Sequence, residues 1–426
     1  MSGFHYKDGI LHADDISMVD IASEYGTPSY VYCLTEIKKQ ILALKQALRG
    51  SLHPDSRPLI AYACKANSNQ AILNYMAQQE CGCDVVSGGE LSRALQAGIP
   101  AERIVFSGVG KTDEEILQAL QAGIHQINVE SLPELRRIIA IAEHSTISVA
   151  VAFRMNPDVE AGTHAKITTG KSDNKFGMLR GDIKVAYKLC EGSEFVEPVG
   201  LSMHIGSQLT ALGPYREAFG VMADFVNELR SNGHEITRLD IGGGLGVIYD
   251  DEKPIDPAAY TDLIKEIIEP LDTQIILEPG RYLTANAGVL ISRVIYAKES
   301  ENRNYLILDA GMNDLMRPAL YEAYHSIRPV MEQGGRKSRA YDVVGPVCET
   351  GDTFAKDREI EEAKDGELIA MMSAGAYGAA MGSNYNTRAL PAEILVEGRN
   401  SAVIRQRQDI QDIIKKDIIP DWLDTD

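Results

Sequence analysis

The chain has 426 residues, of which 44% are hydrophobic and 24% charged, so disordered and fibrous classes are excluded and one or two globular domains are expected. Its 42 lysines and arginines stand against 61 aspartates and glutamates, and the net charge of −19 argues against nucleic acid and anionic membranes as partners. No apolar run could span a bilayer and the N-terminus lacks a signal-peptide pattern, so we expect a cytoplasmic protein.

The six cysteines are scattered along the chain, unlike the dense framework of a small disulfide-rich domain. Cys81 and Cys83 form a C-x-C pair, but no second Cys or His cluster stands nearby to complete a zinc site. We therefore expect buried thiols at these positions and no bound metal.

Apolar, β-rich runs alternate with amphipathic helical segments before residue 280. In chain order the expected strands are Ile60 to Ala63, Asp84 to Val86, Ile104 to Ser107, Gln126 to Val129, Val149 to Phe153, Gly200 to His204, Thr237 to Ile241 and Gln274 to Leu277. Eight strand-helix units of this length predict an α/β fold, a (β/α)8 TIM-like barrel. A doubly wound parallel sheet is the alternative.

Glycine and polar residues mark the ends of the helices between these strands. The segments "GGELSRALQAGI" and "TDEEILQALQAGI" end at Gly98 and Gly123, where glycine would terminate a helix. Thr112 precedes an acidic first turn and is suited to cap that helix.

The pattern changes from about Arg281 onward. Short β-type runs such as "VLISRVIYA", "NYLILDAG" and "AEILVEG" follow one another with few helical segments between them. We predict a mainly antiparallel β domain at residues 281–426, a barrel at 36–280, and an N-terminal segment, 1–35, that joins the β domain.

Polar residues follow four of the expected barrel strands. The stretch "LIAYACKANS" puts Lys65 after the first strand, where a lysine is either solvated or held in a cleft to form a Schiff base. "MHIGSQ" follows the sixth strand, "DIGGGLG" the seventh and "EPGR" the eighth, and they supply His204, Ser207, Gly242, Gly243, Gly244, Glu278, Gly280 and Arg281. Barrel enzymes carry their chemistry at the carboxyl ends of the strands, so we expect these residues at one mouth.

The glycine run after the seventh strand is either a tight turn or a phosphate-binding turn. Backbone N–H groups without side chains can approach a phosphate closely, especially beside the start of a helix. Barrels commonly bind phosphate after the seventh strand, and Ser207 would add a hydroxyl donor nearby. The sequence therefore predicts a phosphate site here.

A strand-one lysine, a His-x-Gly-Ser turn, a glycine run and Glu-Pro-Gly-Arg, followed by a β domain, resemble the pyridoxal-phosphate-dependent decarboxylases of the alanine-racemase-like fold type. Four further blocks occur in the family's order. They are "HAKITTGKSDNKFGM" from His164, "DAGMNDLMRPALYEAYHSI" from Asp309, "GPVCETGD" from Gly345 and "AGAYGAAMGSNYN" from Ala374. The resemblance covers nearly the whole chain, and it implies decarboxylation of meso-2,6-diaminopimelate to L-lysine and CO2, the last step of bacterial lysine biosynthesis.

The resemblance implies pyridoxal 5′-phosphate as the cofactor, held by Lys65 as a Schiff base that the substrate amine displaces. Glu278 would lie near the ring nitrogen and His204 would stack on the ring face, although in isolation these could be a solvated turn residue and a core histidine. The implied cofactor site consists of Lys65, His204, Ser207, Gly242, Gly243, Gly244, Glu278, Gly280, Arg281 and Tyr377.

The substrate implied by the resemblance has a second amino-acid centre that the enzyme must also hold. Arg281, Arg317 and Tyr321 are suited to its distal carboxylate, because a guanidinium fork matches a carboxylate. Glu349 would take the distal ammonium, and Tyr377 would contact substrate as well as phosphate. Taken singly, each could instead form a surface salt bridge or pack in the core.

Cys348 would donate the proton that replaces CO2, and the resemblance places it in the active site of the second subunit of a homodimer. A single cysteine is usually inert and buried, so this role rests on the block "GPVCE". Whether Cys348 or Lys65 delivers the proton stays open.

Three other functions fit parts of the pattern. A related enzyme acting on ornithine, arginine or carboxynorspermidine would use the same cofactor residues, but Arg317 and Tyr321 favour a distal carboxylate. A catalytically silent relative would be expected to lack Lys65 or Cys348, and both are present. A barrel that binds another phosphate ester would leave Lys65 and the Cys348–Glu349 pair without a role.

Overall fold

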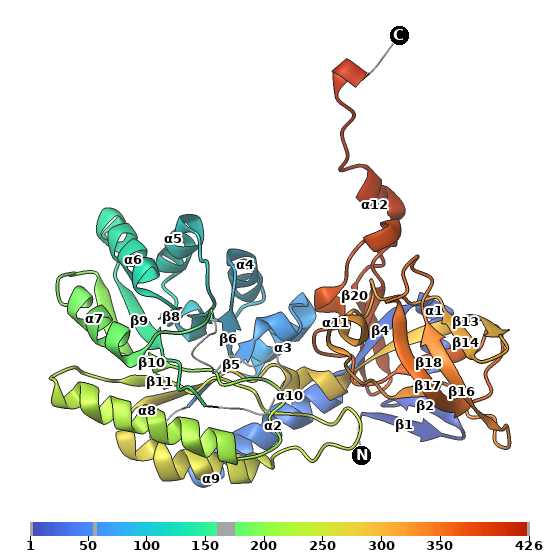
Figure 1. The fold of residues 1–426 in the computed structure, drawn as a ribbon, viewed down its shortest axis with the longest axis horizontal. Helices are drawn as coiled ribbons and strands as arrows, with labels where there is room; N and C mark the ends of the chain where they lie inside the picture. The colour runs from blue at the N-terminus through green and yellow to red at the C-terminus, as the bar shows by residue number, and fades with distance from the viewer. Residues whose placement is uncertain (1–2, 54–57, 160–174, 424–426) are drawn as a thin grey trace. The chain divides into compact units, whose positions relative to one another are not determined.

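The computed structural model describes residues 3–53, 58–159 and 175–423, so residues 164–174 of the block that begins at His164 lie outside the described residues. The chain divides into two units (Figure 1). The barrel unit comprises Lys39–Ile248 and Glu252–Leu283, and the β unit comprises Met1–Lys38, Tyr249–Asp251 and Thr284–Asp426.

Eight parallel strands of the barrel unit form a closed ring. They are β5 (Leu59–Ala63), β6 (Gly82–Val85), β7 (Ile104–Phe106), β8 (Gln126–Val129), β9 (Val149–Arg154), β10 (Val196–Ser202), β11 (Arg238–Asp240) and β12 (Gln274–Leu277). The ring closes because β12 pairs with β5 and β9 pairs with β10. The predicted barrel is confirmed, and closure excludes the doubly wound sheet.

The expected strand positions agree with the structure to within a few residues. Gln126–Val129 and Gln274–Leu277 match without a shift, whereas β10 begins at Val196 rather than at Gly200. The early part of β10 contains Pro198, which reads as a turn residue in the sequence, and the pairing register with β9 shifts between Pro198 and Gly200. An irregular strand therefore looks like a loop followed by a shorter strand.

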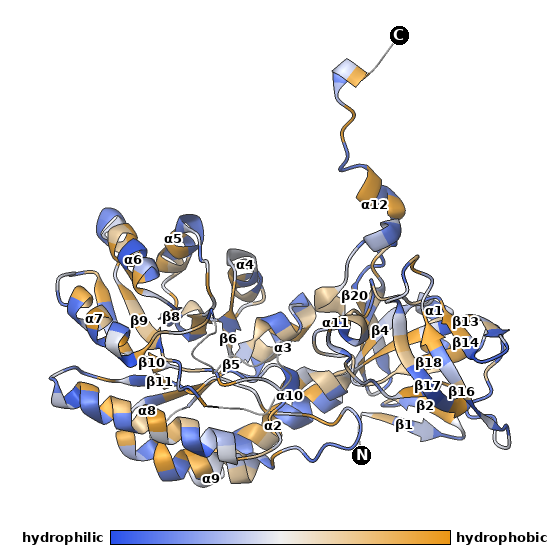
Figure 2. Ribbon diagram, in the orientation of Figure 1, coloured by the Kyte–Doolittle hydropathy of each residue, from blue (hydrophilic) through white to orange (hydrophobic). Residues whose placement is uncertain are grey.

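Helices surround the ring (Figure 1). They are α2 (Leu34–Ser51), α3 (Gln70–Gln78), α4 (Gly88–Gln96), α5 (Asp113–Ala122), α6 (Leu132–Ser145), α7 (Arg180–Cys190), α8 (Gly213–Ser231), α9 (Pro257–Ile267) and the short α10 (Arg281–Thr284). Figure 2 shows hydrophobic and hydrophilic residues alternating along α8, as expected for a helix packed on one side. Within the described ranges, no helix combines the length and apolarity that a membrane crossing requires.

The helix ends follow the local chemistry of their residues. Thr112 caps α5 as predicted, since its hydroxyl accepts the Glu115 N–H while the Glu115 side chain accepts the Thr112 N–H. The helix ends at Gly123, whose φ of 66° places it in the left-handed region that glycine tolerates best. Gly98, with φ of 90°, lies one residue beyond the cap of α4.

The β unit is built around a mixed, mainly antiparallel sheet with strand order β17-β16-β14-β13-β4-β19-β20. Its strands are β4 (Ser29–Cys33), β13 (Gly288–Glu299), β14 (Asn304–Leu308), β16 (Ser338–Val344), β17 (Thr353–Glu361), β19 (Ala392–Glu397) and β20 (Asn400–Arg405). In addition, β18 (Leu368–Met371) pairs with β13, and β15 (Ile327–Pro329) pairs with β18. A separate three-stranded sheet, β1 (Phe4–Lys7), β2 (Ile10–Ala13) and β3 (Ile16–Ser17), leads into α1 (Met18–Tyr25). Two short helices follow later in the chain, α11 (Arg317–Tyr321) and α12 (Ile410–Ile414).

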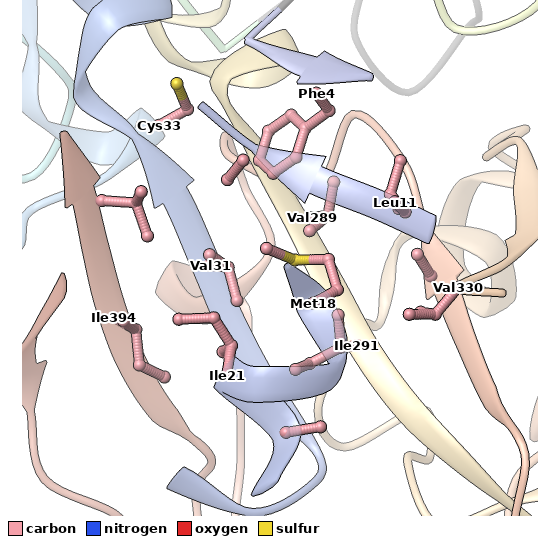
Figure 3. Packing of buried hydrophobic residues seen from close by; sticks show 14 of the residues in the cluster. Phe4, Leu11, Met18, Ile21, Val31, Cys33, Val289, Ile291, Val330 and Ile394 are labelled. Atoms are coloured by element: carbon pink, nitrogen blue, oxygen red, sulfur yellow. The ribbon is translucent and has the colours of Figure 1, made fainter. Parts of the chain in front are cut away.

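The core of the β unit joins chain segments that are far apart in sequence. Met18 and Ile21 of α1 lie against Val31 of β4, Ile291 of β13 and Ile394 of β19 (Figure 3). All five side chains are at most 1% exposed. Strand β4 lies between β13 and β19, so the N-terminal segment is an integral part of this sheet.

Gly200 provides a test of the barrel packing, because a Cβ on this residue would lie 1.8 Å from the Arg238 carbonyl oxygen of β11. We expect Gly200→Ala to separate β10 from β11 and to destabilise the protein by about 1–3 kcal/mol. Gly220→Ala is the matched control, because nothing lies within 4 Å of its Cβ position in α8. The control should stabilise by about 0.5–1 kcal/mol, and urea unfolding measures both. Equal midpoints for the two variants would contradict this packing.

Candidate active site

Four strand ends bring predicted polar residues to one end of the barrel. Lys65 and His204 each stand two residues beyond their strands, β5 and β10, while Gly242 and Glu278 follow β11 and β12. These strands are parallel neighbours in the ring, in the order β10, β11, β12, β5. The carboxyl-end mouth of the barrel therefore holds all four residues, which is where barrel enzymes carry out their chemistry.

Lys65 is anchored but accessible. It lies in the short 3-10 helix Cys64–Ala66, and its Nζ is 3.1 Å from Oδ2 of Asp84 in β6. The Lys65 side chain is 40% exposed, whereas that of Asp84 is fully buried. Asp84 Oδ1 has no hydrogen-bond partner among the described residues, so the mouth contains a buried acceptor with unused capacity. An amine held in this way can be approached from solution and stays oriented.

Two further buried carboxyl groups, Asp240 and Glu278, lie close to Asp84. Burial raises the pKa of Glu278 well above its usual range, and the charges of Asp240 and Asp84 raise it further while Lys65 opposes them. Burial also raises the pKa of Asp240 to about 6, although hydrogen bonds from Glu278, Asn128 and the Gly242 N–H favour its charged form. At neutral pH the proton of this pair therefore belongs to Glu278.

Ser107 and Asn128 connect these carboxyl groups across the barrel interior. Asn128 Nδ2 donates to Asp240 Oδ2 at 2.8 Å and to Ser107 Oγ at 3.0 Å, and Ser107 Oγ donates to Glu278 Oε1 at 3.2 Å. Both linking residues are buried. The network thereby fixes the orientation of Glu278 and Asp240 before any ligand is present.

His204 is held as a neutral ring. Its Nδ1 accepts a long hydrogen bond of 3.4 Å from the Gly243 N–H, which leaves the proton on Nε2. Burial lowers the pKa of His204 well below its usual value, and the positive charges of Lys65 and Arg154 lower it further. A neutral imidazole at the mouth is better suited to stack on a flat ligand than to donate a proton as an acid.

The glycine run can be made only of glycine. A Cβ on Gly242 would lie 2.3 Å from Met203 O, one on Gly243 2.2 Å from Glu278 O, and one on Gly244 2.5 Å from the Gly206 carbonyl oxygen. Gly242 donates its N–H to Asp240 Oδ1 at 3.0 Å. The Gly243 N–H is likewise bonded, to His204 Nδ1. Of the three backbone N–H groups, the phosphate prediction therefore depends on that of Gly244, together with Ser207 on the adjoining turn.

The segment Glu-Pro-Gly-Arg packs on the turn that carries Lys65. A Cβ on Gly280 would lie 3.0 Å from Ala63 Cβ and 3.1 Å from Ala66 Cβ, and the Ala63 N–H donates to Pro279 O at 3.2 Å. Arg281 is the first residue of α10 and is partly buried. The last and first strands of the ring thus position Glu278 and Lys65 jointly.

Arg317 belongs to the β unit, where it begins α11 and is only 6% exposed. Its Nη1 donates to His325 Nε2 at 2.9 Å, and its guanidinium lies 4.5 Å from the centre of the Tyr249 ring. His325 Nδ1 in turn donates to Met372 O at 2.8 Å, so this histidine is neutral and oriented. Tyr321, at the other end of α11, is partly buried.

Cys348 is exposed, whereas the other five cysteines are buried, including the Cys81 and Cys83 thiols predicted to be so. Asp352 holds the loop that presents Cys348, because its carboxylate accepts the N–H groups of Met312 and Val347 at 2.6 and 2.7 Å. Glu349 on this loop is exposed. In the neighbouring loop Tyr377 adopts a left-handed φ of 57°. The two motif blocks that contain Cys348 and Tyr377 therefore have defined loop conformations.

The structure divides the predicted site residues between the two units. Lys65, His204, Ser207, Gly242, Gly243, Gly244, Glu278, Gly280 and Arg281 lie in the barrel unit, and Arg317, Tyr321, Cys348, Glu349 and Tyr377 lie in the β unit. Among the described residues, no group of three or more His, Cys, Asp or Glu side chains is arranged to hold a metal ion.

Sequence reasoning missed several residues that the structure places beside the predicted ones. They are Asp84, Ser107, Asn128 and Asp240 in the barrel unit and Tyr249 and His325 in the β unit. A signal was present for the first four, since each is a polar residue within one position of the carboxyl end of a barrel strand. No local sequence pattern marked Tyr249, because only the tertiary fold brings it into contact with Arg317.

A family model described as "Pyridoxal-dependent decarboxylase, pyridoxal binding domain" matches residues 34–285, which is more than half of the chain and includes the whole ring of strands. The chain belongs to the pyridoxal-dependent decarboxylases. A relative from Zymomonas mobilis named diaminopimelate decarboxylase is 46% identical over 425 residues, covering 99% of this chain and 100% of the relative. One from Pseudomonas aeruginosa with the same name is 44% identical and covers 97% of this chain and 98% of its own length. Within its class the chain is thus a member of the diaminopimelate decarboxylase family.

Solved structures agree with this assignment. Diaminopimelate decarboxylase from Helicobacter pylori complexed with L-lysine superposes with a TM-score of 0.89 at 42% identity, covering 93% of this chain and 98% of that one. The enzyme from M. jannaschii in complex with L-lysine gives 0.92 at 38% identity, covering 99% and 100%. The similarity thus includes both units, and L-lysine is the ligand of both relatives.

The barrel mouth fits the cofactor of the class, pyridoxal phosphate. Lys65 offers an oriented amine, and Asp84 offers a buried acceptor with unused capacity. The turn around Gly243 and Gly244 has no room for side chains, as a phosphate-binding backbone requires. These features would hold the aldehyde end and the phosphate end of the cofactor, with Glu278 available to its ring nitrogen.

We expect borohydride reduction of the holoenzyme to fix the cofactor on the peptide that contains Lys65, because this amine is accessible and oriented. Mass spectrometry of a digest locates the label, and visible absorbance reports the Schiff base before reduction. Lys111 is an internal control, since its amine is buried and paired with Glu134 at 2.7 Å. A label on Lys111 or on any other lysine would contradict the assignment.

Proposed function

We propose that this chain catalyses the pyridoxal-phosphate-dependent decarboxylation of meso-2,6-diaminopimelate to L-lysine and CO2, in the cytoplasm, as the last step of bacterial lysine biosynthesis. The observation that carries the proposal is the oriented Lys65 amine beside three buried carboxyl groups at the barrel mouth. Full-length relatives that bear the name of this activity support it.

The residues of the barrel unit each have a task in this reaction. Lys65 would hold the cofactor through its oriented amine, which would become free to move a proton once the substrate amine has replaced it. When bound, the cofactor supplies an electron sink for the pair released with CO2. Glu278 would hold a proton at the ring nitrogen so that the sink is effective, and neutral His204 would cover one ring face and exclude water from it.

The residues of the β unit select the substrate in this proposal. A carboxylate at the distal centre needs a donor with two parallel N–H groups, and the buried Arg317 guanidinium is such a donor. His325 and Tyr249 hold that guanidinium in place, so little side-chain entropy is lost when the substrate binds. Tyr321 and Arg281 add donors, and the exposed Glu349 supplies a negative charge for the distal ammonium.

We expect Arg317→Met to lower kcat/KM for meso-diaminopimelate at least tenfold, because charge-assisted hydrogen bonds of about 1.5–3 kcal/mol each are lost. Arg328→Met is the matched control, since it removes an exposed arginine of the same unit and should leave kcat/KM unchanged. Visible absorbance of the bound cofactor and the thermal midpoint establish that the buried Arg317 variant has folded. The wild type should turn over neither lysine nor ornithine, and turnover of either would contradict distal selection.

Cys348 is the proposed proton donor, acting in the active site of the second subunit of a homodimer. The support is that it is the exposed cysteine of the described chain and lies on a loop whose backbone Asp352 holds in place. An exposed thiol on a loop that is held in place can reach the active site of a neighbouring subunit without a rearrangement of the loop. The same patch would then serve both subunits across a two-fold axis.

Mixing two inactive variants tests this shared site. Lys65→Ala and Cys348→Ala chains should each be nearly inactive alone. After subunit exchange, roughly half of the dimers are hybrid and each hybrid has one intact site, so about a quarter of wild-type activity should return. A chain with both substitutions, mixed with Lys65→Ala, should recover nothing. If Cys348 acts within its own chain, the first mixture will recover nothing either, even when exchange is demonstrated with tagged chains.

A further inference from the structure

Asp240 and Glu278 form a pair of buried carboxyl groups, and the proposed mechanism uses Glu278 but gives Asp240 no role. Asp240 ends β11 and is in register with Ile276 of β12, and Glu278 stands two residues beyond Ile276. In a strand, residues two apart point to the same side. The two carboxyl groups accordingly meet inside the barrel, where they are hydrogen-bonded to each other.

Two buried carboxyl groups that share a hydrogen bond must also share a proton, because carboxylates alone have no hydrogen to donate. The surrounding donors decide which of them is the anion. Asp240 receives two N–H groups, from Asn128 at 2.8 Å and from Gly242 at 3.0 Å, whereas Glu278 receives the Ser107 hydroxyl at 3.2 Å. Donation to both oxygens favours the anionic form of Asp240. The proton therefore resides on Glu278 and points to Asp240.

The titratable neighbours of the pair come from three other elements. Asp84 of β6 raises the pKa of Glu278, and Lys65, after β5, lowers it. Tyr260 of α9 is neutral, since burial and the charge of Asp240 raise its phenol pKa. Within the described ranges, the negative charge of Asp240 is the largest of these influences on Glu278 after burial itself.

We propose that Asp240 is a positioning residue that orients Glu278 and keeps its carboxyl group protonated until the cofactor's ring nitrogen is placed against it. This inference rests on the proposed function, because it assigns Glu278 to that nitrogen. The Glu278 O–H bond then breaks, an N–H bond forms on the nitrogen, and Glu278 remains as a carboxylate. The net charge of the pair changes from −1 to −2, and the ring nitrogen gains a positive charge beside it. Because Glu278 supplies the proton, none has to enter from solvent.

The proposal is tested on cofactor-free protein by infrared spectroscopy of the carboxylic-acid carbonyl band. The difference between wild type and Glu278→Gln isolates the Glu278 band, and its loss with rising pH gives the ionisation midpoint of Glu278. In the Asp240→Asn background, with Asp240→Asn/Glu278→Gln as the reference, we expect that midpoint to fall by about one pH unit or more. Asp84→Asn is the matched control: it removes a neighbouring charge but no hydrogen bond to Glu278, so the midpoint should fall less.

An unchanged midpoint in Asp240→Asn, or a shift no larger than that of Asp84→Asn, would overturn the role of Asp240. If Asp240→Asn fails to fold, Asp240→Ser must lower the midpoint in the same direction. Absorbance titration with pyridoxal phosphate is a second readout, and weaker cofactor binding is expected for Asp240→Asn. Failure of the proposed function would appear separately, as absent labelling of Lys65, while the infrared result in cofactor-free protein would stand.

Discussion

Closure of eight parallel strands into a ring is the constraint on which the rest of this structure depends. A closed ring has no edge, and alternate side chains of every strand enter a narrow interior that excludes water. A polar group there is costly unless another polar group satisfies it. Asp84, Asn128 and Asp240 are buried at the carboxyl end, and each is bonded to a residue from another part of the ring.

The same constraint sets the charges of the candidate active site. Three carboxyl groups in a region of low dielectric cannot all be ionised beside a single nearby lysine, so burial and mutual repulsion leave the proton on Glu278. Conversely, burial lowers the pKa of His204, and the positive charges of Lys65 and Arg154 lower it further, so this ring is neutral. One buried environment thus produces an acid with a proton, an oriented amine and an uncharged ring. A cofactor that needs a protonated nitrogen and a flat covered face fits that combination.

In the β unit, buried and partly buried carboxylates have a different task, because they hold loops in place. Asp309 accepts the Ser292 hydroxyl and the Arg293 N–H at 2.6 and 2.8 Å, and Asp314 accepts the Gly311 N–H at 2.8 Å. Together with Asp352, these residues fall within the motif blocks that resemble the family. These three aspartates therefore hold the backbone, and Arg317 and Cys348 are the groups that those loops present.

The sequence by itself determined the fold class, the order of the strands and the strand ends that carry Lys65, His204, the glycine run and Glu278. It could do so because strand periodicity and glycine positions are local properties, and because parallel strands bring their carboxyl ends together whatever their packing. Only the tertiary structure decided which residues meet inside the ring. Asp240 and Asn128 are 112 residues apart, which is far beyond the reach of any local sequence pattern. Their hydrogen bond forms only when the ring closes. The same holds for three other features: the irregular start of β10, the proton shared by Asp240 and Glu278, and the contact of Arg317 with Tyr249. Each depends on distances in space and on burial, and the linear order of residues contains neither.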